Sequence, residues 1–300
     1  MGGDGTSWVD LLDPTTEEIE AAAGVRLGER ELALLVGTGE PRPILFGAGD
    51  HALGAFVVPV AVKDEDRVYY QEVDIVLSSD LALTVRRTPA DGEPFDPTEL
   101  KEACQDVPPS KVAFHLADIV AERYLDLIDD LNEEIDEVED SLEEDSAMGD
   151  VHQRLSGLRH DVLHIRQTLS PTRDAVHRVV DGRVDSEAPG LLDEHEVTLF
   201  SDVYDKLLRA NDALELSRDL VAGVRDFHQS KVAQSQNEVV QRLTAIASIL
   251  LFPTFVVGVY GQNFDVLPEL HWHYGYAFSW AVIILSTVAQ LAFFRRKKWL

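Results

Sequence analysis

Hydrophobic residues change their spacing several times along the chain, and each change predicts a different kind of element. Between Trp8 and about Arg87 the spacing moves between strand and helix periods. Short runs rich in Val, Leu, Ile or aromatic residues, bounded by turn residues, predict strands at residues 31–36, 55–62, 72–78 and 81–85. The run from Asp13 to Glu18 predicts a helix start, with acids in the first turn. We expect a small α/β domain here.

Beyond Pro108 and Pro109 the pattern becomes helical for most of the remaining length. One apolar stripe recurs at intervals of three and four residues on an otherwise polar helix. The stripe consists of Tyr124, Leu127, Leu131, Ile135, Val138 and Leu142. Residues 151 to about 180 predict a second helix, antiparallel to the first across a turn near Gly149.

A third helix is predicted to be very long. Between Pro189 and Pro253 there is no proline, and Gly223 is the single interior glycine. Its apolar positions follow a heptad that Asn211 and Arg218 interrupt, as expected for a stalk that packs against neighbouring helices. These positions are Val197, Phe200, Tyr204, Leu207, Leu214 and Val221.

The stalk leads into two uncharged segments, residues 243–260 and 276–294, each close to the roughly 20 residues that cross a bilayer. They predict a two-span membrane hairpin. Four basic residues follow the second span directly, whereas residues 261–275 contain no Lys or Arg, so we expect both termini in the cytoplasm and the loop outside the inner membrane. The basic residues are Arg295, Arg296, Lys297 and Lys298.

Four mostly small or polar residues repeat every seven positions into and along the first span: Asn237, Thr244, Leu251 and Gly258. Two spans from one chain cannot enclose a pore, so a pore requires several copies of the chain. The spacing fits a stripe that faces a shared pore, and it fits ordinary helix packing about equally well.

Charge narrows the function classes. The formal net charge is −28, which makes nucleic acid an unsuitable partner. The acids either attract cations or only solvate the surface, and composition alone does not choose between these alternatives. Eleven acids and no Lys or Arg lie between Asp129 and Asp145. We find no phosphate-binding loop, catalytic triad, nucleophile elbow or zinc-protease motif, so the sequence predicts no enzyme.

The stretch NEVVQRLTAIASILLFPTFVVGVYGQNF, from Asn237 to Phe264, resembles the first span of CorA-type magnesium transporters, a two-span family with a Gly-x-Asn signature. VLPEL resembles the outer loop of that family, and RRKKWL resembles its basic tail. SDVYDKLLRANDALELSRDLVAGV fits its stalk helix. The expected fold is an α+β membrane protein with a cytoplasmic α/β domain (residues 1–108), a stalk with an antiparallel helix pair (109–236) and a transmembrane hairpin (237–300).

The resemblance implies a homopentameric funnel in which five first spans surround one pore for Mg²⁺, and also for Co²⁺ or Ni²⁺. It implies an outer selectivity ring at the mouth, hydrophobic constrictions along the pore and further lining positions. The ring consists of Gly261, Gln262 and Asn263, the constrictions are Leu243 and Leu251, and the further lining positions are Asn237, Thr254 and Gly258. Asp265 and Glu269 in the outer loop either raise the local cation concentration or are ordinary solvated acids.

The sequence departs from the family pattern in two ways, by a missing acidic residue and by Gln262. Asp202 matches the stalk carboxylate of the regulatory Mg²⁺ site, but the segment that would supply its acidic partner has no acid between Glu31 and Glu40. Gln262 stands where magnesium members commonly have methionine, and His271 and His273 are either incidental or transient Zn²⁺ ligands. A ZntB-like Zn²⁺ transporter, perhaps coupled to protons, and a non-conducting membrane-anchored scaffold therefore stay open as alternatives.

Overall fold

A computed structural model describes residues 8–37, 43–62, 67–89, 93–105, 107–143, 148–262 and 272–300. The chain divides into two compact units, Met1–Val224 and Arg225–Leu300. The strands are β1 (Trp8–Leu12), β2 (Ile44–Gly47), β3 (His51–Val62), β4 (Arg67–Ser78) and β5 (Ala82–Arg86). The helices are α1 (Thr16–Ala22), α2 (Glu29–Val36), α3 (Thr98–Ala103), α4 (Pro109–Glu143), α5 (Met148–Val180), α6 (Arg183–Glu187), α7 (Glu194–Tyr260) and α8 (Gly275–Arg296).

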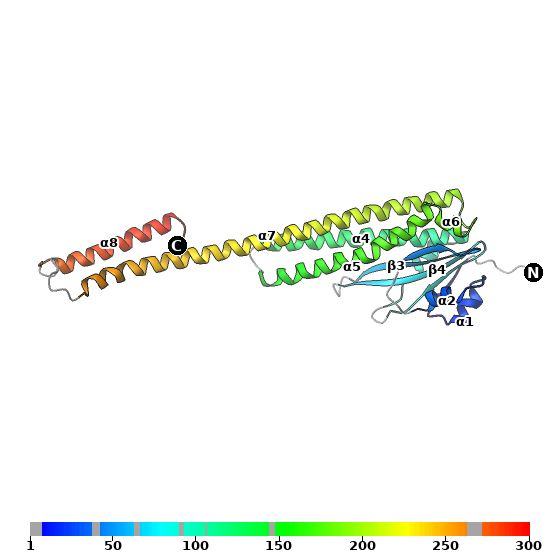
Figure 1. The fold of residues 1–300 in the computed structure, drawn as a ribbon, viewed down its shortest axis with the longest axis horizontal. Helices are drawn as coiled ribbons and strands as arrows, with labels where there is room; N and C mark the ends of the chain where they lie inside the picture. Colours follow the sequence, from blue (N-terminus) through cyan, green and yellow to red (C-terminus); the bar gives the residue numbers. More distant parts are fainter. Residues whose placement is uncertain are drawn as a thin grey trace, which may run out of the picture. The chain divides into compact units, whose positions relative to one another are not determined.

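The first unit is built around a five-stranded sheet with the strand order β1-β5-β4-β3-β2. β1 pairs with β5 in parallel, and the other three pairings are antiparallel. Helices α1 and α2 cover one face, while α4, α5 and the first part of α7 lie over the other (Figure 1). The sheet is therefore the middle layer of an α/β unit, as the sequence predicts.

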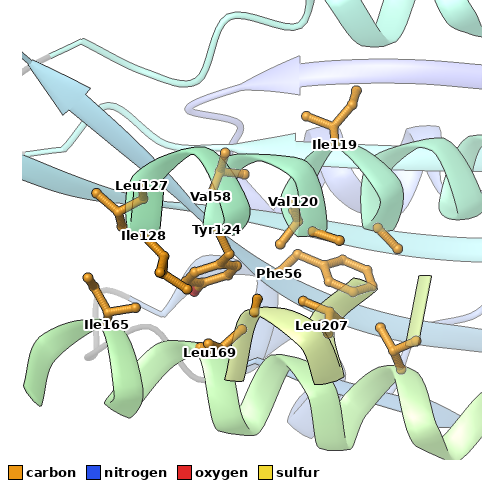
Figure 2. Close-up of a cluster of buried hydrophobic side chains, with 14 of the residues drawn as sticks. Phe56, Val58, Ile119, Val120, Tyr124, Leu127, Ile128, Ile165, Leu169 and Leu207 are labelled. Carbon is orange, nitrogen blue, oxygen red and sulfur yellow. The ribbon is translucent and has the colours of Figure 1, made fainter. Parts of the chain in front are cut away.

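The alternation of side chains along a strand supplies both faces of this sheet. On β3, Leu53 packs with Ile19 of α1 and Leu35 of α2, whereas Phe56 packs with the long helices. The larger cluster joins β3 to α4, α5 and α7 through Phe56, Tyr124, Leu169 and Leu207, all fully buried (Figure 2). Burial of one such side chain stabilises the fold by roughly 1.5–3 kcal/mol.

The start of α1 agrees with its prediction. The Thr15 hydroxyl accepts a hydrogen bond from the backbone N–H of Glu18 at 3.3 Å, and the Glu18 carboxylate accepts one from the backbone N–H of Thr15 at 2.8 Å. This capping box contributes on the order of 1 kcal/mol to helix stability.

The strand predicted at residues 31–36 is wrong, because these residues form most of α2. The Glu31 carboxylate accepts a hydrogen bond from the Gly28 backbone N–H at 2.6 Å, so Gly28 begins a helix of good helix formers. Leu35 is buried and Leu32, three residues earlier, is half-buried, whereas Ala33 is exposed, which is a helical rather than an alternating pattern. The sequence does not predict β1 and β2, which are edge strands of five and four residues.

Polar contacts join α4 to α7. Ser110 donates a hydrogen bond to the buried Glu196, and further along both helices Ser217 donates one to Asn132 at 2.7 Å. Residue numbers rise together on the two helices, so α4 and α7 run parallel. The predicted stripe of α4 from Tyr124 to Leu142 is buried, and so are Phe200, Leu207, Leu214 and Val221 of the predicted stalk stripe.

Candidate functional site

Two helices of the described residues, α7 and α8, are long and apolar enough to cross a membrane. Their most apolar 18-residue windows have mean hydropathies of 2.0 and 1.9. Only 11% and 6% of these windows are buried within the chain, which distinguishes them from the core helices of a soluble domain. Both segments belong to the second unit, far in sequence from the position of a signal peptide. They fit the predicted two-span hairpin.

Within the second unit, α8 folds back along the last part of α7 (Figure 1). Ala245 and Val256 are buried and eleven residues apart, which puts them on one side of α7 and marks the side that packs against α8. Gly275 and Phe294 of α8 are also buried. Other apolar side chains of both helices stay open, among them Leu285 at 70% exposure. Most of the apolar surface of the hairpin is therefore not buried by its own chain.

The predicted pore stripe lies on a different face of α7 from the one that packs against α8. Thr244 precedes the buried Ala245 by one residue, a rotation of about 100° around the helix. Leu251, one heptad beyond Thr244, is 70% exposed, and Leu243 is 61% exposed. Asn237, Thr254 and Gly258 are also exposed. No element of the second unit covers this stripe in the described part of the chain.

The threonines of α7 have a defined hydrogen-bonding role. The hydroxyl of Thr244 donates to the Val240 carbonyl, and that of Thr254 donates to the Leu250 carbonyl, both at 2.8 Å. Because each hydroxyl proton is used within the helix, the oxygen lone pairs are left to accept from outside. Such oxygens can receive hydrogen bonds from the water of a hydrated cation.

At its end, α7 presents backbone oxygen. Gly261 donates its N–H to the Val257 carbonyl at 2.9 Å, and Gln262 donates to Val259 at 3.3 Å. The last carbonyls of a helix carry partial negative charge, which favours a nearby cation. Gly261 and Gln262 are exposed there. The other predicted residues of the mouth and loop, Asn263, Asp265, Glu269 and His271, lie outside the described residues.

The basic end of α8 has a defined turn. Lys298 adopts a left-handed conformation with φ of 57°, Lys298 N–H bonds the Arg295 carbonyl, and Trp299 N–H bonds the Phe294 carbonyl. The Trp299 ring stacks on Phe294 at 5.7 Å between centroids. The side chains of Arg295, Arg296, Lys297 and Lys298 are exposed around this turn.

Asp202, the predicted regulatory ligand, is exposed on the first part of α7. It lines a shallow depression together with Asp205, Lys206, Leu208 and Arg209. No group of three or more His, Cys, Asp or Glu side chains within the described residues could hold a metal ion. Asp202 is thus not part of a metal-binding cluster of three or more such side chains in the described ranges.

Lys206 is a residue that sequence reasoning does not find. Its ammonium group lies 2.6 Å from the Asp118 carboxylate and 2.8 Å from that of Glu122, both on α4. Burial lowers the pKa of Lys206, but the hydrogen bonds to the two carboxylates outweigh it and raise the pKa overall. A lysine on the polar side of a stalk gives no sequence signal for such a contact.

A sequence profile described as "CorA-like Mg²⁺ transporter protein" matches residues 3–296, nearly the whole chain. The chain belongs to the CorA-like Mg²⁺ transporter family. The predicted resemblance is thus confirmed, and the family is one of transporters, not of enzymes. The CorA-like architecture, an α/β unit followed by long helices and two apolar C-terminal helices, agrees with the fold described above.

Individual relatives agree with membership of the CorA-like family. The cobalt/magnesium transport protein CorA of Thermotoga maritima is 34% identical over 187 residues, which cover 62% of this chain and 52% of that protein. The chain thus spans about half the length of the curated relatives it matches.

Two solved structures share the fold. The CorA magnesium transporter of Methanocaldococcus jannaschii superposes with a TM-score of 0.78 at 19% identity, over 98% of this chain and 91% of that one. The ZntB cytoplasmic domain of Vibrio parahaemolyticus gives a TM-score of 0.57 at 10% identity, over 76% of this chain and 88% of that domain.

Proposed function

We propose that this chain is a divalent-cation transporter that passes Mg²⁺, and also Co²⁺ or Ni²⁺, through a pore made by five copies. The observation that carries the proposal is the open stripe from Asn237 through Thr244 and Leu251 to Gly258, which faces away from α8 and leads to the Gly261 end of α7. Exposed polar groups in a membrane span need partners or water. Other copies of α7 around a shared axis supply both.

Gly258 supports close contact between copies. Beyond its own turn of helix, a Cβ atom built there meets no atom of the described residues within 4 Å, so packing among those residues does not require glycine at this position. Small residues allow the backbones of membrane helices to approach each other. In the proposed assembly, Leu243 and Leu251 form the hydrophobic constrictions, and Asn237, Thr254 and Gly258 line the remaining pore.

The proposed selectivity ring consists of Gly261, Gln262 and Asn263. Mg²⁺ gives up its water reluctantly and usually keeps several water ligands when bound. A ring of neutral amide and backbone oxygens can hydrogen-bond the hydrated ion without trapping it, and conduction needs such a weak grip. Asp265 and Glu269 would raise the cation concentration at the entrance.

We place both termini in the cytoplasm and the Gly-x-Asn loop outside, since Arg295 to Lys298 follow the second span. The proposed division is residues 1–108 for the α/β domain, 109–236 for the stalk and helix pair, and 237–300 for the hairpin. Asp202 is proposed as a regulatory Mg²⁺ ligand at a boundary between copies, because it stands at the position of the stalk carboxylate of the regulatory site in the family that the chain resembles.

Flux into liposomes tests the proposal. The purified chain is expected to admit Mg²⁺ under an inward gradient, and Asn263→Ala should reduce this flux to the level of empty liposomes. Asn211→Ala, the same change in the stalk, is the matched control and should leave flux intact. Absence of flux from the unaltered chain, combined with tolerance of changes at Gly261 and Asn263, would favour the scaffold alternative.

Zn²⁺ transport is the second candidate, and Gln262 is the residue that favours it, since magnesium members commonly have methionine at this position. Zn²⁺ and Mg²⁺ uptake should be compared with and without a pH gradient. Proton-stimulated Zn²⁺ uptake that exceeds Mg²⁺ uptake would overturn Mg²⁺ as the main cargo.

A further inference from the structure

Two exposed histidines lie one turn apart on α5 of the first unit, and neither is among the residues proposed for transport. His160 and His164 are four residues apart, which puts them on the same side of the helix. Their ring centroids are 4.4 Å apart, with an angle of 59° between the ring planes. The described residues thus hold two imidazoles side by side at the surface of the first unit.

We propose that His160 and His164 together bind a transition-metal cation of the Ni²⁺, Co²⁺ or Zn²⁺ type, with water completing the coordination. Two imidazole nitrogens that share such an ion at about 2.0–2.1 Å lie roughly 3.3 Å from each other across a tetrahedral angle. Rings whose centroids are 4.4 Å apart can meet that requirement by small rotations of their side chains. Imidazole suits these ions, whereas Mg²⁺ prefers oxygen ligands.

A third residue holds part of the pair in place. The ring of Tyr70, on β4, stacks against His164 with centroids 6.2 Å apart and planes 25° apart. Tyr70 is therefore a positioning residue: it limits the rotation of His164 and reduces the entropy lost when an ion binds.

The surroundings favour a cation. Arg154 of α5 pairs with Glu137 of α4 at 3.1 Å, which fixes the antiparallel register of the two helices. His160 lies six residues after Arg154 on α5. Counting six residues back from Glu137 on the antiparallel α4 places His160 at the level of Leu131, within the acid-rich part of α4. Clustered carboxylates raise the local concentration of cations.

The number of ligands sets what this site can do. No group of three or more His, Cys, Asp or Glu side chains with metal-binding geometry occurs in the described ranges, so the pair offers two protein ligands and open positions for water. An ion held by two imidazoles exchanges readily. We infer a site that is occupied only when transition metals accumulate, and that distinguishes them from abundant Mg²⁺.

Calorimetric titration of the full chain in detergent with Ni²⁺, with Mg²⁺ in large excess to occupy oxygen-ligand sites, tests the proposal. The unaltered chain is expected to bind one more Ni²⁺ per chain than the His160→Ala/His164→Phe double variant. Each single change should weaken binding at least about tenfold, since changes around metal ligands alone cost 10–100-fold. His164→Phe keeps an aromatic ring for Tyr70 and removes only the nitrogen ligands.

His152→Ala, at an exposed position two turns before His160, is the matched control and should bind Ni²⁺ as the unaltered chain does. Unchanged Ni²⁺ binding in the double variant, or displacement of the ion by Mg²⁺, would overturn the site. Mg²⁺ flux of the double variant is expected to be normal, so failure of this site and failure of the transport proposal are separate results.

Discussion

The two parts of α7 have opposite surroundings. The part within the first unit buries residues at helical spacing against its own chain: Phe200, Val203, Leu207, Ala210, Leu214, Ser217, Val221 and Val224. The part from Arg225 onward buries only Ala245 and Val256 among its described side chains. One continuous helix thus has a first part that its own chain buries and a second part that its own chain leaves largely exposed.

The difference shows where folding energy comes from. Leu207 is fully buried, whereas Leu250, Leu251 and Phe255 are 64%, 70% and 65% exposed. Apolar surface of this extent is not left in water by a stable protein, so lipid or other copies of the chain must cover it. The first part of α7 is stabilised by its own chain, and the second part depends on the membrane and on assembly.

The largest expected effect comes from the same substitution in both parts. Phe200→Ala removes a buried ring and should lower the free energy of unfolding by about 3–5 kcal/mol. Phe255→Ala removes a ring that its own chain does not bury, and it should change the unfolding of the first unit by less than about 0.5 kcal/mol. Thermal unfolding of the full chain in detergent, followed by circular dichroism, measures both. If both variants lost the same free energy of unfolding, the two parts of α7 would not differ in how their own chain stabilises them.

A pH titration sharpens the contrast further, because the first unit contains a buried carboxyl group. Burial, together with the charge of Glu72, raises the pKa of Asp74 to about 8, although Arg87 opposes the shift. The folded chain therefore keeps a proton that the unfolded chain loses near pH 4. The stabilisation is complete below that pH and is lost as pH rises through about 8, a change on the order of a few kcal/mol.

Melting temperatures at pH 5 and pH 8.5 test this, and we expect the lower pH to be the more stable. Asp74→Asn should flatten the difference. Asp226→Asn, at an exposed position in the second part of α7, should preserve it. A pH dependence that survives Asp74→Asn would assign the effect to other groups.

The smallest expected effect compares two serines of α7. Ser217 is fully buried and donates to Asn132 of α4, so Ser217→Ala should cost about 1 kcal/mol. Ser230 is exposed and donates only to the Asp226 carbonyl of its own helix. Ser230→Ala should therefore stay within about 0.5 kcal/mol of the unaltered chain in the same unfolding experiment. A comparable loss at both positions would contradict the assigned role of Asn132.

Periodicity predicts the long helices well, since each has a stripe that its own chain buries. It fails at residues 31–36, where a short apolar run fits a strand or a helix and the bond between Glu31 and Gly28 decides for the helix. One interruption of the stalk heptad, Asn211, gains a partner that only the fold reveals, whereas Arg218 pairs with a neighbour three residues earlier on its own helix. Asn211 accepts a hydrogen bond from Ser170 at 3.4 Å, and Arg218 pairs with Glu215 at 2.7 Å.

The candidate pore is predictable in part. Uncharged length predicts the spans, and the seven-residue repeat predicts which residues share a face, because both follow from helix geometry. Which face of α7 is left exposed depends on how α8 packs against it. The repeat from Asn237 to Gly258 does not predict that packing. His160 and His164 have a spacing visible in sequence, but the stacking of Tyr70 on His164 joins residues 94 positions apart and has no local signal.

The polar contacts between α4 and α7 also constrain how these helices can move. Lys206 binds Asp118, and Ser217 binds Asn132, so the parallel pair is fastened at separate levels. Sliding one helix past the other by a turn, about 5.4 Å, would break both contacts at once. Tilting the pair together breaks neither. Within the first unit, these contacts favour movement of α4 and α7 as one rigid pair, so that a displacement at one end of the pair also displaces the other end.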